Sequence, residues 1–222
     1  MTCNEILEWF EQNRSEYNIA GMKRFGIESE KIFGVKLAQI EYIRKIIKRD
    51  HPLALELWDT RYHEARHLAA LLADPKIIEE STIDKWVSDF DNWAVCDSVC
   101  GKLFIKTEFA YQKVEEWQSA DKLYVKRAAF AMIAWIALHH KKLPDNFFDR
   151  YFDLILQHAT DDRNYIKKAV NWALRQIGKR NPLLSRTTLD ICDELVEIYP
   201  ESKSARWIAA DARRELNKKY PE

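Results

Sequence analysis

The stretch Tyr-Ile-Lys-Lys-Ala at residues 165–169 matches the stretch Tyr-Val-Lys-Arg-Ala at residues 124–128, at an offset of 41 residues from 124 to 165. A helix-forming sequence follows each copy. Pairs of helices that repeat every 40–47 residues or so are typical of HEAT and armadillo proteins. Such pairs stack into a curved solenoid, in which one helix of each pair lines the concave side. The two stretches therefore predict an all-α superhelix, and the alternative is a chance match of two helix starts in a globular bundle.

Helical periodicity extends over nearly the whole chain, and the alternation typical of strands is absent. The prolines fall near the predicted joins, and no low-complexity linker divides the sequence. This pattern predicts one domain over residues 1–222, an alpha-alpha superhelix of HEAT-like repeats with a concave basic cleft. The predicted helices cover residues 3–18, 34–49, 52–59, 62–73, 75–90, 92–106, 108–118, 122–141, 145–159, 162–179, 185–199 and 202–219.

The composition narrows the class of protein. Lysine and arginine number 35 and aspartate and glutamate also number 35, so the net charge of zero neither favours nor excludes nucleic acid. The four cysteines form no Cys-x-x-Cys pair, which fits a reducing cytoplasm better than a disulfide framework or a zinc site. We expect no signal peptide, and no apolar run is long enough for a membrane span. We expect a cytoplasmic monomer.

The predicted helix at residues 165–179 has two contrasting faces. Its apolar stripe follows helical spacing and consists of Ile166, Ala169, Val170, Ala173 and Ile177. The opposite row consists of Lys168, Trp172, Arg175 and Lys179. This row contains no glutamate for ion pairs, and an aromatic ring among cations suits a phosphate backbone with a base or sugar. The alternative is an ordinary basic surface helix whose tryptophan packs on a neighbour.

A second candidate site lies at the start of the predicted helix 92–106. Asp91 or Asn92 is a suitable N-cap, and Trp93 and Asp97 stand one turn apart on the same face. An aromatic ring beside a carboxylate suits a cationic ligand, because both groups attract positive charge. The alternative is a half-buried tryptophan beside a solvated aspartate.

Arg127 begins a run that is apolar nearly all round, at the position equivalent to Lys168 in the repeat. A cation at the start of a buried helix needs a partner, which we expect to be a carboxylate, a phosphate or water.

The sequence His63-Glu64-Ala65-Arg66-His67 has the form His-Glu-x-x-His, which on a helix can bind zinc. We discount a zinc protease because no third ligand has a suitable spacing and no strand is predicted beside this helix. Both histidines point away from the predicted core stripe of this helix. We expect them to be exposed or near a ligand-facing surface, and we expect no metal and no cofactor.

The chain resembles the AlkD-like DNA alkylation repair family, which are helical-repeat DNA glycosylases. Four stretches within about residues 30–185 carry this resemblance: Glu56-Leu-Trp-Asp59 with the helix of Glu64 and Arg66, the stretch Asn92–Val99, the stretch Tyr124–Ala129, and the stretch Ile166–Pro182. The family pattern often has an aromatic residue where this chain has Asn92 and an aspartate where it has Ala94.

The resemblance implies a concave cleft that grips duplex DNA and an enzyme that excises positively charged alkylated purines, 3-methyladenine and 7-methylguanine, in base excision repair. By position, Asp97 would be the catalytic carboxylate, Trp93 and Trp172 the aromatic residues of the cleft, and Arg127 a phosphate contact. A helical-repeat scaffold that binds DNA structures or a protein partner without catalysis is the alternative.

Overall fold

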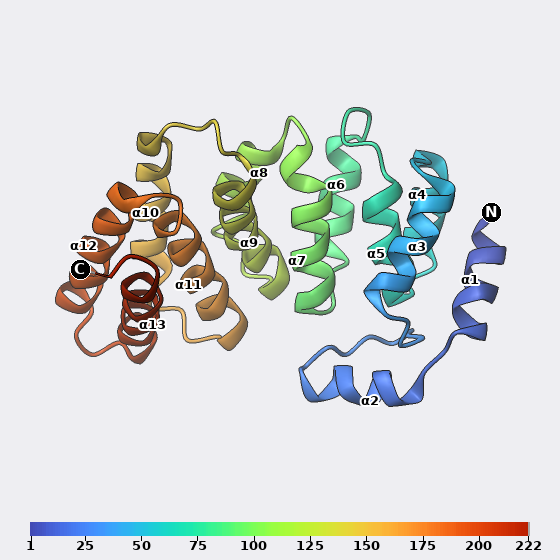
Figure 1. Ribbon diagram of the computed structural model, residues 1–222, viewed down its shortest axis with the longest axis horizontal. Helices are drawn as coiled ribbons and strands as arrows, with labels where there is room; N and C mark the ends of the chain where they lie inside the picture. The colour runs from blue at the N-terminus through green and yellow to red at the C-terminus, as the bar shows by residue number, and fades with distance from the viewer. Residues whose placement is uncertain (222) are drawn as a thin grey trace. The chain divides into compact units, whose positions relative to one another are not determined.

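The computed structural model describes residues 1–221, and helices with short connections make up its architecture (Figure 1). The α-helices and the two short 3-10 helices are α1 (Cys3–Gln12), α2 (Glu16–Arg24), α3 (Leu37–Ile47), α4 (His51–Asp59), α5 (His63–Leu72), α6 (Glu80–Ser88), α7 (Trp93–Lys102), η1 (Phe104–Lys106), α8 (Ala110–Trp117), α9 (Leu123–His139), η2 (Asp145–Phe148), α10 (Asp149–His158), α11 (Asn164–Gly178), α12 (Pro182–Ile198) and α13 (Lys203–Lys219). The all-α prediction is confirmed.

Two predicted helix boundaries are wrong. The predicted helix 3–18 is two helices, because the chain turns after α1 and the Ser15 side chain caps α2 by accepting the amide of Asn18. The amide of Ser15 donates to the carbonyl of Phe33, at 2.9 Å, so the break depends on a contact distant in sequence. Pro75 does not begin the predicted helix 75–90; it lies in a turn, and α6 starts at Glu80.

The chain divides into two compact units, residues 1–110 and 111–222, and each is described by itself. The single domain over residues 1–222 therefore stays a prediction. No helix within residues 1–221 is long and apolar enough to cross a membrane.

In the first unit, α5 is the central helix and packs against α3, α4 and α7. Nearly all of its residues are buried, including the predicted core stripe of Ala65, Leu68, Ala69 and Leu72. The core beside it contains Trp58 and Trp86, whose rings stack 4.1 Å apart. Helix α2 lies crosswise below the upright helices α3, α5 and α7 in Figure 1, and Ile19 is its only buried residue among those described.

In the second unit, α9 and α11 pack against each other along their lengths, and α12 and α13 both pack on α11. The apolar run of α9 and the apolar stripe of α11 are buried, as predicted. The two repeat tyrosines meet, with the rings of Tyr124 and Tyr165 5.9 Å apart. The 41-residue repeat from 124 to 165 thus corresponds to two neighbouring helices of the fold.

Candidate nucleic-acid interface

The start of α7 is fixed by Asn92, which confirms one of the two predicted N-caps. Its backbone is extended, and its Oδ1 accepts the amides of Ala94 and Val95, each at 3.0 Å. Two otherwise unpaired amides of the first turn are thereby satisfied. The Asn92 side chain is buried, and its Nδ2 donates to Asp91 Oδ1 at 2.7 Å.

Trp93 and Asp97 lie in α7, one turn apart, and both are half-buried. The indole Nε1–H of Trp93 donates to the carbonyl oxygen of Phe25, 3.0 Å away. This bond ties the end of α2 to the first turn of α7 and fixes the orientation of the ring. Its aromatic faces remain the part of Trp93 that can contact a ligand.

A cavity of about 850 Å³ lies beside Trp93, between α2, α3, α5 and α7. Its wall is mostly apolar and includes Ala94 and Ser98 from the same side of α7. Three apolar side chains at this cavity are exposed to solvent: Tyr17 at 88%, Phe25 at 75% and Leu37 at 63%. Sequence patterns gave no sign of the cavity, because its walls come from four separate helices.

Of the two surroundings expected for His63 and His67, exposure is wrong, since both side chains are buried. Their position near a ligand-facing surface stays a prediction. Their Nε2 atoms are 3.1 Å apart, and both rings belong to the cavity wall. Burial and the nearby Arg66 lower the pKa of His63 to about 4. Burial and the neighbouring His63 also lower the pKa of His67, so both rings are neutral at pH 7.

Glu64, the second residue of the His-Glu-x-x-His sequence, holds a loop that shares the cavity wall with the two histidines. Its buried carboxylate accepts the amides of Phe33, Gly34 and Val35, with N···O distances from 2.6 to 3.2 Å. Gly34 has a positive φ of 76°, and a Cβ there would lie 2.4 Å from the Ser15 carbonyl oxygen, so the close approach requires glycine. Glu64 anchors a loop here, and this role differs from that of a catalytic base.

Arg127 in α9 has a partner that was not expected. Its guanidinium is buried, and Nη1 donates to the backbone carbonyl of Tyr165 at 2.6 Å. The carbonyl belongs to the next repeat, so this bond joins α9 to α11. The Tyr165 carbonyl is a partner that comes from the packing of the two helices. The expected carboxylate, phosphate or water partner of Arg127 stays a prediction.

Trp172 of α11 belongs to an aromatic cluster. Its half-buried ring meets Trp135 edge to face, with centroids 5.4 Å apart. Trp135 in turn stacks on His139 at 5.2 Å. Sequence reasoning missed Trp135, although its spacing of one helical turn from His139 was visible.

The basic row of α11 does have carboxylate partners, contrary to the expectation from α11 alone. Helix α13 places Asp211 and Glu215 beside it, and Arg175 Nη1 lies 3.6 Å from the first carboxylate and 3.3 Å from the second. Lys179 pairs with Glu215. The hydrogen bond from Lys179, with the charges of Lys179 and Arg175, lowers the pKa of Glu215. Lys168 is exposed at the start of the row.

The predicted site residues thus form two sets. Trp93 and Asp97 belong to the first unit, whereas Arg127, Trp172 and the basic row belong to the second. That all of them share one concave surface stays a prediction. Within the described residues, no three His, Cys, Asp or Glu side chains are grouped so as to hold a metal ion.

The fold and the two-faced helix α11 define the class of this protein as an all-α protein of HEAT-like helical repeats. The family model described as "DNA alkylation repair enzyme" matches residues 6–216. The chain therefore belongs to the DNA alkylation repair enzyme family.

One similar solved structure is described as "A new family of proteins related to the HEAT-like repeat DNA glycosylases with affinity for branched DNA structures". It is 20% identical to this chain, with a TM-score of 0.79, and the match covers 99% of this chain and 95% of that one. At this identity the likeness supports the fold. No curated protein matches this chain significantly.

Proposed function

We propose that this protein is a DNA glycosylase that excises positively charged alkylated purines, such as 3-methyladenine and 7-methylguanine, from duplex DNA. The observation that carries the proposal is the pair of Trp93 and Asp97 on one face of α7, in a chain of the DNA alkylation repair family. Trp93 also belongs to the wall of the apolar cavity.

The chemistry suits this pair. A purine alkylated on a ring nitrogen is positively charged and is already a good leaving group. Breaking its glycosidic bond moves positive charge to the sugar, and a fixed carboxylate stabilises that charge or orients the attacking water. In this proposal Asp97 is the catalytic residue. Trp93 supplies contact area and cation–π attraction of about 0.5–2 kcal/mol.

The second unit would hold the DNA backbone. Because Lys168 is exposed, it is the cation of the α11 row that a DNA phosphate can contact most directly. Trp172 provides an aromatic ring one turn further along the same row. Arg175 and Lys179 would bind phosphate only after their ion pairs with the carboxylates of α13 are broken. Arg127 would act mainly by holding the two repeats together.

The second candidate is a non-catalytic scaffold that binds DNA structures. One observation favours it: the similar solved structure is described as having affinity for branched DNA. A scaffold would bind DNA without releasing any base. Asp97 favours the catalytic function over the scaffold. A carboxylate at a DNA surface repels phosphate, and it stabilises the complex only when positive charge develops in the transition state.

The test is single-turnover release of 7-methylguanine by the wild type and by Asp97→Asn, which keeps the shape and removes the charge. Release should fall roughly 10²–10³-fold, as when one preorganised electrostatic group is deleted. Affinity for undamaged DNA should stay equal or rise slightly, and stability should change by about 1 kcal/mol or less.

Glu108→Gln is the matched control, because it removes an exposed carboxylate from the same unit. It should excise like the wild type. Normal excision by Asp97→Asn, or no release of base by the wild type, would rule out the glycosylase and leave the scaffold.

A further inference from the structure

The wall of the cavity between α2, α3, α5 and α7 is rich in rings. Five of its side chains are aromatic or imidazole: Tyr17, Phe25, His63, His67 and Trp93. Its size of about 850 Å³ lies in the range of small-molecule sites, and rings of this kind favour a planar ligand that can stack. A flexible alkyl chain would gain less from such a wall.

A buried donor without a partner belongs to this wall. The Oδ1 of Asn92 accepts two backbone amides, so its Nδ2, 3.4 Å from His63 Nδ1, acts as the donor to that ring. Neutral His63 then carries its proton on Nε2 and donates to Nε2 of His67. Neutral His67 must therefore carry its proton on Nδ1.

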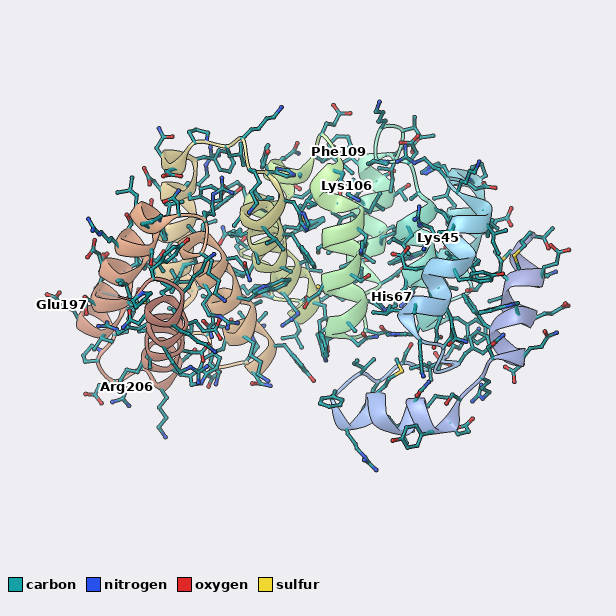
Figure 2. The ribbon with its side chains drawn as sticks, in the orientation of Figure 1. Lys45, His67, Lys106, Phe109, Glu197 and Arg206 are labelled. Carbon is teal, nitrogen blue, oxygen red and sulfur yellow. The ribbon has the colours of Figure 1, made fainter. Side chains whose placement is uncertain are left out.

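Nδ1 of His67 has no hydrogen-bond partner, although the side chain is only 3% exposed. This nitrogen has almost no exposed surface, so a ligand in the cavity can contact the ring of His67 but not this atom. Figure 2 shows His67 low among the upright helices of the first unit, above α2. The position suits a ligand that enters between α2 and these helices.

The charge of the wall is positive. Within the described residues, it includes the cations Arg24 and Lys36 and no carboxylate. Both cations are exposed, so they can meet a charged group that stays in water while the rest of the ligand is buried. The ligand that fits these features has a planar ring and a negative charge.

We propose that this cavity binds an unpaired nucleotide. The base would stack against the rings of the wall, and the phosphate would meet Arg24 and Lys36. A free mononucleotide and an unpaired nucleotide in a DNA strand share this chemistry. The second source rests on the DNA binding of the proposed function, whereas the first does not.

Gly21 allows the cavity to be closed without disturbing the fold. It lies on the same stripe of α2 as Tyr17, Arg24 and Phe25, at helical spacing, and all four belong to the wall. A Cβ built at Gly21 meets no atom within 4 Å. Gly21→Leu should therefore occupy ligand space, and Gly21→Ala is the matched control that keeps the space open. Both changes favour the helix.

The experiment measures the binding of two ligands to the full chain. One is deoxyadenosine monophosphate, followed by tryptophan fluorescence, with deoxyadenosine as the uncharged comparison. The other is a duplex with one unpaired 2-aminopurine, followed by the fluorescence of that base, with the fully paired duplex as the comparison. Gly21→Leu should weaken nucleotide binding about tenfold relative to Gly21→Ala, the scale of losing one stacked base. Affinity for the paired duplex should not change.

The charges have their own test. Arg24→Gln with Lys36→Gln should weaken binding of the monophosphate and leave that of the nucleoside unchanged. Binding of the monophosphate alone would assign the cavity to free nucleotides, and binding of the unpaired duplex would assign it to DNA. No binding of either ligand, or equal binding by Gly21→Leu and Gly21→Ala, would overturn the proposal.

These outcomes are separable from the failure of the proposed function. A wild type that releases no 7-methylguanine but binds the unpaired base in a manner sensitive to Gly21→Leu would keep the nucleotide cavity and reject the glycosylase. A wild type that releases base but shows no effect of Gly21→Leu on either ligand would do the reverse.

Discussion

The carboxylates of α13 should compete with DNA for the basic row of α11. Asp211→Asn with Glu215→Gln keeps the shape of both side chains and removes their charge. The Nδ2 of Asn171 now donates to Asp211 Oδ2 at 2.7 Å, and an asparagine oxygen can accept the same bond. The double variant should therefore fold as the wild type does while Arg175 and Lys179 lose their ion pairs.

The magnitude follows from the contacts. Arg175 pairs with both carboxylates and Lys179 with one, and the carboxylate side chains are 13% and 32% exposed. Partly exposed ion pairs of this kind contribute about 0–1 kcal/mol each, so DNA binding should tighten by up to roughly 2–3 kcal/mol at low salt. The two released cations should steepen the slope of log K against log salt by up to about 1.8, at about 0.9 for each phosphate contact.

The assay is fluorescence anisotropy of a labelled, undamaged duplex over a series of salt concentrations. Asp153→Asn with Glu197→Gln is the matched control, because it removes the same charge from exposed positions on α10 and α12 of the same unit; Glu197 is labelled in Figure 2. An equal gain in the control would mean that net charge alone matters. An unchanged salt slope in the α13 variant would mean that the basic row does not touch DNA.

Three further outcomes are expected. Glu64→Ala should lower the free energy of unfolding by about 3 kcal/mol or more, because it leaves the amides of residues 33–35 without their acceptor; urea unfolding measures this, and unchanged hydrogen exchange of those amides would contradict it. The buried histidines have lower pKa values in the folded than in the unfolded protein. Their contribution to stability is therefore complete above about pH 6.5 and is lost as the pH falls. For His63 the loss reaches about 3 kcal/mol when the pH approaches its folded pKa of about 4. Between pH 7 and pH 5 the free energy of unfolding should fall less in His63→Gln with His67→Gln than in the wild type. An equal fall in that variant would refute the linkage. A chelator should leave the melting temperature unchanged, and one bound zinc that is lost in His63→Ala with His67→Ala would restore the metal hypothesis.

Local sequence determined the helices and their buried faces. The 3.6-residue spacing of apolar residues in 165–179 predicted the buried stripe of α11, and the capping side chain of Asn92 predicted the start of α7. These features follow from contacts within about one helical turn, so they can be read from neighbouring residues. The offset between residues 124 and 165 also identified two helices that pack together, because equivalent repeats stack on each other.

Only the tertiary structure decided the surroundings of the candidate site. His63 and His67 lie opposite the core stripe of α5, yet the loop held by Glu64 and the crosswise helix α2 enclose them. The row of Arg175 and Lys179 contains no acidic residue of its own, yet α13 supplies it with the carboxylates of Asp211 and Glu215. Glu215 lies 36 residues after Lys179 in the chain. Helical periodicity shows which face of a helix is apolar, but the partner of the other face depends on long-range packing, which periodicity does not encode.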